Sequence, residues 1–186
     1  MSGMDESTNF SLELPAYSVK RLVPKDAEVL QQLYEQCTEF ALLTDGQPPL
    51  PTAAREEFDA VPEGKTTQDK YIFGLFDPDD ILVGMIESIR YYPDNETWWL
   101  GLMMLAPEQR GQGLGSKFYR AFERWVSSQG VPRISLSVVE ANESGLQFWK
   151  KMGFEVIRKT PPRQFGIKTH ELYVLSRAVT DALGYS

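Results

Sequence analysis

The chain has 186 residues, of which 42% are hydrophobic and 24% charged, ordinary values for one globular domain. Its formal net charge is -7, from 26 acidic and 19 basic residues, and a net acidic surface disfavours nucleic acid as a partner. A membrane span needs about 18 consecutive apolar residues, and no stretch of the chain is that long. Residues 1–15 lack the pattern of a signal peptide. The single cysteine, Cys37, excludes an internal disulfide. These features predict a cytoplasmic protein with neither a membrane nor a nucleic acid as partner.

The N-terminal part is expected to hold one strand and two helices. Residues 1–16 are polar and indicate a mobile tail. Residues 17–23 alternate like a strand, and Pro24 then opens a helix whose apolar positions recur at helical spacing as far as Ala41. A short helix at 53–58 follows between two polar loops.

The middle of the chain carries three strand patterns, divided by the turn sequences DPDD and PDNE. They lie at 71–76, 81–92 and 97–105. Such short acidic turns favour hairpins, so we expect an antiparallel run of three strands.

The last part of the chain alternates helix and strand. An amphipathic helix is expected from Gly113 to Gln129, because Gly130 and Pro132 follow it as stop signals. The remaining elements are, in order, a strand at 133–139, a helix at 142–152, a strand at 154–159, a loop at 160–169 and a strand at 170–177. This order predicts a single mixed α/β domain.

Three glycines at alternate positions, Gly111, Gly113 and Gly115, join the third of these strands to the long helix. Glycine lets the backbone approach a ligand closely, and a helix N-terminus offers unpaired N–H groups to an anion. Arg110 and Lys117 add positive charge beside the turn. The pattern predicts a diphosphate site, and an ordinary tight strand-to-helix turn is the alternative interpretation.

Other phosphate motifs fit this turn less well. A Walker loop requires a glycine-lysine pair, but Ser116 separates Gly115 from Lys117. The dinucleotide fingerprint has its third glycine three positions after the second, whereas here the interval is two, and the turn follows an antiparallel run of strands. A nucleotide-phosphate binder is therefore the weaker alternative.

Two segments resemble the GNAT superfamily of N-acetyltransferases. PEQRGQGLG at 107–115 is similar to the acyl-CoA motif P-x-x-R-G-x-G-I/L-G, although Glu108 departs from the Gln or Arg that begins the motif's shorter form. ANESGLQFWKKMGF at 141–154 is similar to N-x-x-A-x-x-F-Y-x-x-x-G-F, with Gly145 in place of alanine and Trp149 in place of tyrosine.

The resemblance implies an α/β fold with a mixed central sheet, a splayed pair of strands and flanking helices. Residues 17–180 would form this single domain. The two splayed strands would be those at 97–105 and 133–139, with the pantetheine arm of acetyl-CoA lying in the gap between them.

The resemblance also implies acetyl-CoA as co-substrate. The backbone amides of residues 110–115, with Ser116, would bind its pyrophosphate. The strand from Met103 to Leu105 would pair with the pantetheine arm, and the Leu105 N–H would polarise the thioester carbonyl. Asn142 would hydrogen-bond the arm or hold a water near the sulfur. The implied acetyl-CoA-binding residues are Met103, Leu105, Arg110, Gly111, Gln112, Gly113, Leu114, Gly115, Ser116, Asn142 and Trp149.

Acetyl transfer to an amine needs a proton acceptor, a stabilised carbonyl oxygen and a thiolate that leaves. Where some relatives carry a glutamate, this chain has Trp99 or a close neighbour of it. The candidate bases are Glu87 and Glu140, and each is otherwise an ordinary surface or salt-bridged carboxylate. An indole has no acidic proton to give, so Trp149 is expected to form a wall of the pantetheine tunnel.

The predicted function is acetyl transfer from acetyl-CoA to a primary amine of a small molecule, peptide or protein, by direct attack in a ternary complex. A non-catalytic acyl-CoA-binding regulatory module is the alternative, because the expected glutamate and tyrosine are both missing. Without clusters of Cys or His, no metal is expected. The protein is expected to be a monomer or homodimer. Cys37 is expected to be inert core, His170 to pack or lie at the surface, and Asp45 to form a turn unless it pairs with a substrate ammonium.

Overall fold

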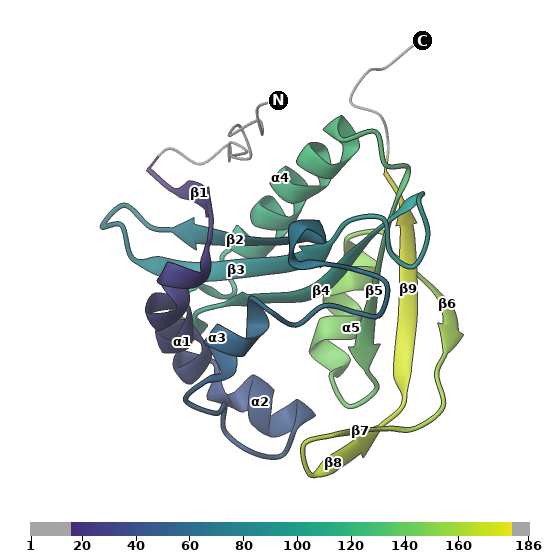
Figure 1. Ribbon diagram of the computed structural model, residues 1–186, viewed down its shortest axis with the longest axis horizontal. Coiled ribbons are helices and arrows are strands. Elements are labelled where there is room, and N and C mark those ends of the chain that lie inside the picture. The colour runs from purple at the N-terminus through teal and green to yellow at the C-terminus, as the bar shows by residue number, and fades with distance from the viewer. Residues whose placement is uncertain (1–15, 180–186) are drawn as a thin grey trace.

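The computed structural model describes residues 16–179 and is built on one seven-stranded sheet (Figure 1). Every neighbouring pair of strands is antiparallel except β4 and β5, which are parallel. The strands, in the order in which they lie, are β1 Ser18–Arg21, β2 Lys70–Phe76, β3 Leu82–Ile89, β4 Thr97–Leu105, β5 Arg133–Val139, β9 Leu172–Ala178 and β6 Glu155–Lys159. The predicted mixed sheet is confirmed. The predicted tail at 1–16 lies outside the described residues, apart from Ala16.

Five helices of the described residues flank this sheet. They are α1 Ala27–Gln36, α2 Thr38–Thr44, α3 Ala53–Glu57, α4 Leu114–Ser128 and α5 Glu143–Lys151, with short 3-10 turns at Pro24–Asp26, Thr67–Asp69 and Pro107–Gln109. In Figure 1, α1, α2 and α3 lie together near the first strands, and α5 lies beside β5.

The helix predicted from Pro24 to Ala41 is wrong in its continuity, because the chain breaks at Cys37. The backbone there has φ -100° and ψ 31°, which ends α1 and starts α2. The Thr38 hydroxyl donates to the Glu35 carbonyl at 2.6 Å, which satisfies an acceptor that the end of α1 leaves free. The helical spacing of apolar residues does not reveal such a break.

A small hairpin, β7 Arg163–Phe165 and β8 Lys168–His170, occupies part of the predicted loop at 160–169. Its two-residue turn begins at Gly166, whose φ of 53° suits glycine. The hairpin docks on the end of α2: Lys168 Nζ donates to the Leu42 carbonyl at 2.9 Å, and His170 Nε2 lies 2.8 Å from the Thr44 carbonyl. The hairpin and the end of α2 therefore form one wall.

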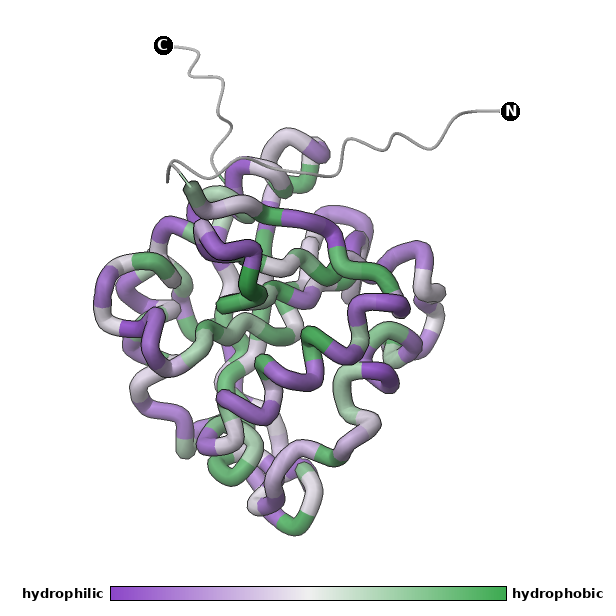
Figure 2. Tube along the Cα trace, turned by 90° about the vertical axis from the view of Figure 1, so that its left-hand side faces the viewer, coloured by the Kyte–Doolittle hydropathy of each residue, from purple (hydrophilic) through white to green (hydrophobic). Residues whose placement is uncertain are grey.

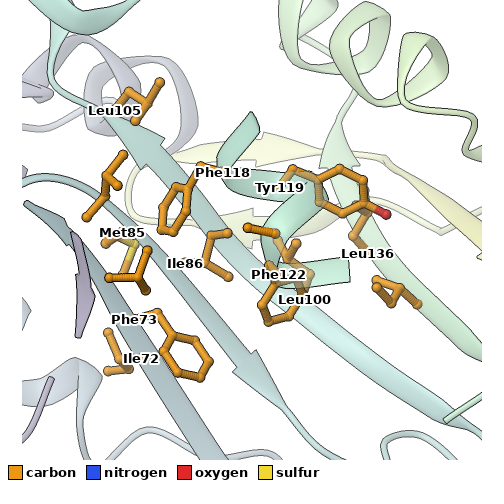
Figure 3. Packing of buried hydrophobic residues seen from close by; sticks show 14 of the residues in the cluster. Ile72, Phe73, Met85, Ile86, Leu100, Leu105, Phe118, Tyr119, Phe122 and Leu136 are labelled. Carbon is orange, nitrogen blue, oxygen red and sulfur yellow. The ribbon is translucent and has the colours of Figure 1, made fainter. Parts of the chain in front are cut away.

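The two faces of β2 face different helices. Phe73 packs on α4, with its ring 4.9 Å from that of Trp125 and 6.3 Å from that of Phe122. Figure 3 shows Phe73, Phe118 and Phe122 within this layer, and Figure 2 shows hydrophobic residues along the middle of the trace. Because side chains alternate along a strand, Lys70 and Ile72 face the other way, toward α1 and α3.

Candidate active site

β4 and β5 separate part-way along their length. They pair only from Thr97 opposite Arg133 to Leu100 opposite Leu136, although β4 continues to Leu105 and β5 to Val139. A cleft of about 650 Å³ includes this opening. The predicted splay of these two strands is confirmed.

A β-bulge at Gly101 bends β4 where the opening begins. Glu87 lies opposite Leu102 and Ser88 opposite Leu100, so Gly101 is an extra residue on β4. A β-carbon at position 101 would overlap Oε2 of Glu87. The absence of a side chain at 101 therefore makes the space that the Glu87 carboxylate occupies. Sequence reasoning missed this residue, although a glycine inside a strand pattern is a signal for a bulge or a close approach.

The backbone of β4 beyond the bulge has N–H groups that point away from β3. The Ala106 N–H donates to the Val83 carbonyl of β3 at 2.8 Å. N–H groups point to alternate sides along an antiparallel strand, so those of Met103 and Leu105 point away from β3. This orientation fits the predicted pairing of the pantetheine arm, which would add to the free edge like another strand.

The glycine turn after β4 is open to a ligand. Gly111 and Gly113 have φ of 76° and 79°, and a β-carbon on either would meet no atom within 4 Å. Lys117 is the first residue of α4 whose N–H bonds back within the helix, to the Gly113 carbonyl at 3.2 Å. Among the described residues, the N–H groups of 111–116 have no acceptor. They form an amide cradle at the positive end of a 15-residue helix, where an anion is stabilised.

Arg110, the first residue of the range 110–116 expected from the sequence, differs from the rest of the turn. Its N–H donates to the Pro107 carbonyl at 3.2 Å. Its guanidinium group pairs with Glu39 at 2.5 Å and donates to the Leu105 carbonyl at 3.0 Å. Arg110 therefore ties the turn to α2, and its charge is already balanced by Glu39.

The opposite wall of the cleft comes from α5. Asn142 caps this helix, with Oδ1 accepting from the Gly145 N–H at 3.0 Å, and also lines the cleft. A β-carbon at position 145 would overlap Nδ2 of Asn142, which accounts for glycine where the related motif has alanine. Trp149 lines the cleft as well, and its ring packs edge-on against Tyr119 at 5.2 Å.

Tyr119 does not serve as a proton donor in place of the tyrosine that the related motif has at position 149. Its hydroxyl donates to Glu123 at 2.5 Å, and Glu123 in turn pairs with Arg177 at 2.8 Å. Burial, reinforced by the hydrogen bond to Glu123, raises the pKa of Tyr119 above its ordinary value. The residue is part of the core and does not line the cleft.

Of the two candidate bases, the structure brings only Glu87 into the cleft. Its carboxylate is 8% exposed and lies 3.5 Å from Lys70 Nζ. Burial raises the pKa of Glu87 to about 7, an effect that Lys70 opposes and Glu57 reinforces. A carboxyl group with a pKa near neutrality can both take up and release a proton there.

Glu140 lies outside the cleft lining. Its carboxylate is 43% exposed and pairs with Lys159 Nζ at 3.0 Å. The hydrogen bond from Lys159 lowers the pKa of Glu140 below its ordinary value. An exposed, already paired carboxylate of low pKa is a poor proton acceptor.

Aromatic and charged side chains also line the cleft. Tyr92 and Trp99 line it and pack edge-on at 5.9 Å, whereas the neighbouring Trp98 is core. The charged residues of the lining are Asp45, Glu57, Lys70, Glu87 and Arg163.

The remaining expectations concern residues outside the cleft and features of the whole described chain. Cys37 and His170 are both buried and do not line the cleft, in agreement with packing roles. Within residues 16–179, no helix is long and apolar enough to cross a membrane. In the same range, no group of three or more His, Cys, Asp or Glu side chains has an arrangement that could hold a metal ion.

Known proteins share this fold. An acetyltransferase from Thermus thermophilus superposes with a TM-score of 0.72 at 22% identity, covering 90% of this chain and 99% of that one. An acetyl transferase from Salmonella typhimurium, described as modifying the N-terminal serine of ribosomal protein L7/L12, gives a TM-score of 0.72 at 13% identity and covers 90% of this chain and 97% of its own.

Sequence comparison leads to the same group. The uncharacterized N-acetyltransferase YobR of Bacillus subtilis (strain 168) is 26% identical over 120 residues, which are 64% of this chain and 44% of YobR. This chain therefore matches less than half the length of that relative. Residues 28–154 match the Acetyltransferase (GNAT) family, and they contain both motifs and the strands β4 and β5. The chain belongs to the GNAT family of acetyltransferases.

Proposed function

We propose that residues 17–180 act as a single catalytic domain that transfers an acetyl group from acetyl-CoA to a primary amine of a small molecule or peptide. One observation carries this proposal. Free amides follow the end of β4, and the cleft that β4 lines as far as Met103 holds the buried carboxylate of Glu87. The free amides would bind acetyl-CoA, and the Glu87 carboxylate would accept a proton from the amine acceptor.

Acetyl-CoA would lie along β4. Its diphosphate would accept hydrogen bonds from the amides of 111–116, and its pantetheine arm would pair with Met103 and Leu105. Asn142 and Trp149 would bound the arm on the α5 side. The side-chain amide of Asn142 keeps Nδ2 for the arm, because Oδ1 caps the helix.

The proposed reaction has one proton transfer before the attack. An amine of pKa about 10 is mostly protonated at neutral pH, so Glu87 accepts a proton from the ammonium group. The amine nitrogen then attacks the thioester carbon, and the Leu105 N–H stabilises the oxygen as it gains negative charge. As the carbon–sulfur bond breaks, the attacking nitrogen loses its remaining extra proton, which reaches the thiolate through water. The products are the amide and CoA, and Glu87 then returns its own proton to solvent.

Direct attack is favoured over an acetylated enzyme. The only thiol of the chain, Cys37, is 1% exposed, and burial raises its pKa. A buried neutral thiol is a poor nucleophile. Initial-rate plots against both substrates should therefore intersect, whereas parallel lines would indicate a covalent acetyl-enzyme.

The charge of the cleft lining supports a cationic acceptor. The lining includes three carboxylates, Asp45, Glu57 and Glu87, against two cations, Lys70 and Arg163. Glu57 and Glu87 share the single positive charge of Lys70, so an excess of negative charge beside the candidate base would attract a positively charged substrate.

A panel of amines tests the proposal, with release of free CoA thiol as the readout. The panel includes small aliphatic and aromatic amines, amino acids, and peptides with free N-termini. We expect thiol release that depends on one class of amine. Tight CoA binding without turnover on any amine would favour the alternative, a non-catalytic acyl-CoA-binding regulatory module.

A further inference from the structure

A buried lysine stands on the wall of the cleft beside the candidate base. Lys70 begins β2, and its side chain is only 4% exposed. Ile72 pairs with Glu87 and Lys70 with Ile89, so alternation along both strands places Lys70 and Glu87 diagonally on the same face. This is the face toward the cleft, because both side chains line it.

The ammonium group of Lys70 is matched by three acceptors. Nζ donates to Oε1 of Glu57 at 2.6 Å and to the Ala60 carbonyl at 2.6 Å, and it lies 3.5 Å from Oε1 of Glu87. An ammonium ion has three N–H bonds, so the two hydrogen bonds leave one N–H for the ion pair with Glu87. Burying a lysine without such partners would be costly, and the arrangement fixes the position of Nζ.

The Glu57 carboxylate is itself held from a second side. Its Oε2 accepts a hydrogen bond from the Tyr34 hydroxyl of α1 at 3.3 Å. Glu87 has less support: within the described residues, its carboxylate has Lys70 as its only ion-pair or hydrogen-bond partner. Gly101 gives the carboxylate room but no polar contact. The position of the Glu87 carboxylate thus depends on one ammonium group.

We propose that Lys70 is a positioning residue for the base: its ammonium group holds the Glu87 carboxylate above Gly101, where β4 and β5 separate, and Glu57 anchors that ammonium group. The proposal rests on the role of Glu87 given under Proposed function. Lys70 itself touches neither the amine nor the thioester.

The charged groups around Glu87 set the direction of each effect. Lys70 faces it from β2, Glu57 from α3 and the Tyr34 hydroxyl from α1, while Asp45 and Arg163 line the same cleft. The positive charge of Lys70 lowers the pKa of Glu87, and the negative charge of Glu57 raises it. Neutral replacements of these two residues should therefore move that pKa in opposite directions.

The first test is the pH dependence of turnover. In Lys70→Met, the acid limb should move to higher pH, and turnover at pH 7 should fall about fivefold or more if the pKa of Glu87 rises by at least about one unit. In Glu57→Gln, the limb should move to lower pH. Lys70→Arg keeps the charge and should restore most of the wild-type profile. Lys20→Met removes an exposed strand lysine paired with Asp80 and should leave the profile unchanged.

The second test does not depend on acetyl-CoA. Carboxyl-carbon NMR of protein labelled at glutamate, with Glu87 assigned by loss of its signal in Glu87→Gln, gives the pKa of Glu87 directly. Shifts of opposite sign in Lys70→Met and Glu57→Gln would support the positioning role. An unchanged pKa of Glu87 in a folded Lys70→Met protein would overturn it.

The two tests separate the failures of the two proposals. Opposite pKa shifts in a protein that acetylates no amine would leave the positioning role intact and refute the proposed function. If Lys70→Met does not fold, Glu57→Gln decides: a pKa of Glu87 that stays the same or rises in that variant overturns the proposal.

Discussion

The carboxylate of Glu87 on β3 occupies the space that a side chain at Gly101 on β4 would fill. The bulge at Gly101 also marks the point beyond which β4 and β5 cease to pair. One glycine thus bends the strand that would carry acetyl-CoA and admits the candidate base to the cleft. This coupling makes position 101 a sensitive probe of the proposed chemistry.

Gly101→Ala should displace the Glu87 carboxylate and lower turnover about as much as Glu87→Ala does, roughly 100-fold by the usual contribution of a general base. The two effects should not add, because Gly101→Ala has no carboxylate to displace once Glu87 is replaced by alanine. Turnover of Gly101→Ala, Glu87→Ala and the double variant measures this. Fully additive losses would show that position 101 acts on something other than Glu87.

Glu140→Gln is the comparison for Glu87→Gln. Both remove one carboxylate, but only Glu87 lines the cleft. Glu87→Gln should lower turnover at neutral pH and recover part of it at higher pH, where more of the amine is already deprotonated. Glu140→Gln should retain the wild-type pH–rate profile. A larger loss in Glu140→Gln than in Glu87→Gln would reverse the assignment of the base.

The stability of the protein should reflect the same buried carboxyl group. Its folded-state pKa of about 7 is above the ordinary glutamate value of 4.5, so its contribution to stability is fully present below about pH 4.5 and is lost as the pH rises through about 7. Relative to Glu87→Gln, the wild type should therefore lose about 3 kcal/mol of unfolding free energy between pH 4 and pH 8. Urea unfolding of both proteins at several pH values measures the difference, and a constant difference would contradict the raised pKa.

The glycine turn can be tested with a control from the other end of the same helix. Gly113 and Gly130 flank α4, both have positive φ, and a β-carbon on either would meet no atom within 4 Å. Valine at either position should cost about 1–2 kcal/mol of stability through backbone strain. Only Gly113→Val should also raise the Michaelis constant for acetyl-CoA sharply, because only that β-carbon would stand in the diphosphate site. Equal Michaelis constants in the two variants would place the diphosphate elsewhere.

Trp149 should act through contact area and not as an acid. Trp149→Phe should weaken acetyl-CoA binding by about 1 kcal/mol, or about fivefold, and leave the alkaline limb of the pH–rate profile in place. Trp125→Phe is a matched control, because both rings are 8% exposed but Trp125 does not line the cleft. A shift of the alkaline limb in Trp149→Phe alone would mean that the indole takes part in the proton transfers.

Much of the fold was predictable because it follows from periodicity and turn chemistry. The strand at 133–139 was predicted with its observed bounds, and α4 to within one residue at each end. The break at Cys37 and the hairpin around Gly166 were missed. The first depends on a single backbone conformation, and the second consists of three-residue strands held by contacts with α2, more than 110 residues earlier in the chain.

In the candidate site, too, local features were predictable and contacts between distant parts of the chain were not. The amide cradle is local in sequence, and the pattern PEQRGQGLG predicts a diphosphate site there. The ion pair of Arg110 with Glu39 joins distant parts of the chain and was not predicted. The set of Glu57, Lys70 and Glu87 joins α3, β2 and β3, so no spacing along the chain could reveal it. That Glu87 and not Glu140 enters the cleft follows from strand register and the bulge at Gly101, which are properties of the folded sheet.

The most direct measurement follows the acetyl group itself. Acetyl-CoA labelled in its acetyl carbon is incubated with the protein and the amine that gives the fastest thiol release, and both the labelled product and the free thiol are counted. We expect one labelled acetyl group on the amine nitrogen for each thiol released. In Glu87→Gln, the rates of label transfer and of thiol release should fall together. Thiol release without label on the amine, or binding of acetyl-CoA without either product, would contradict the proposed function.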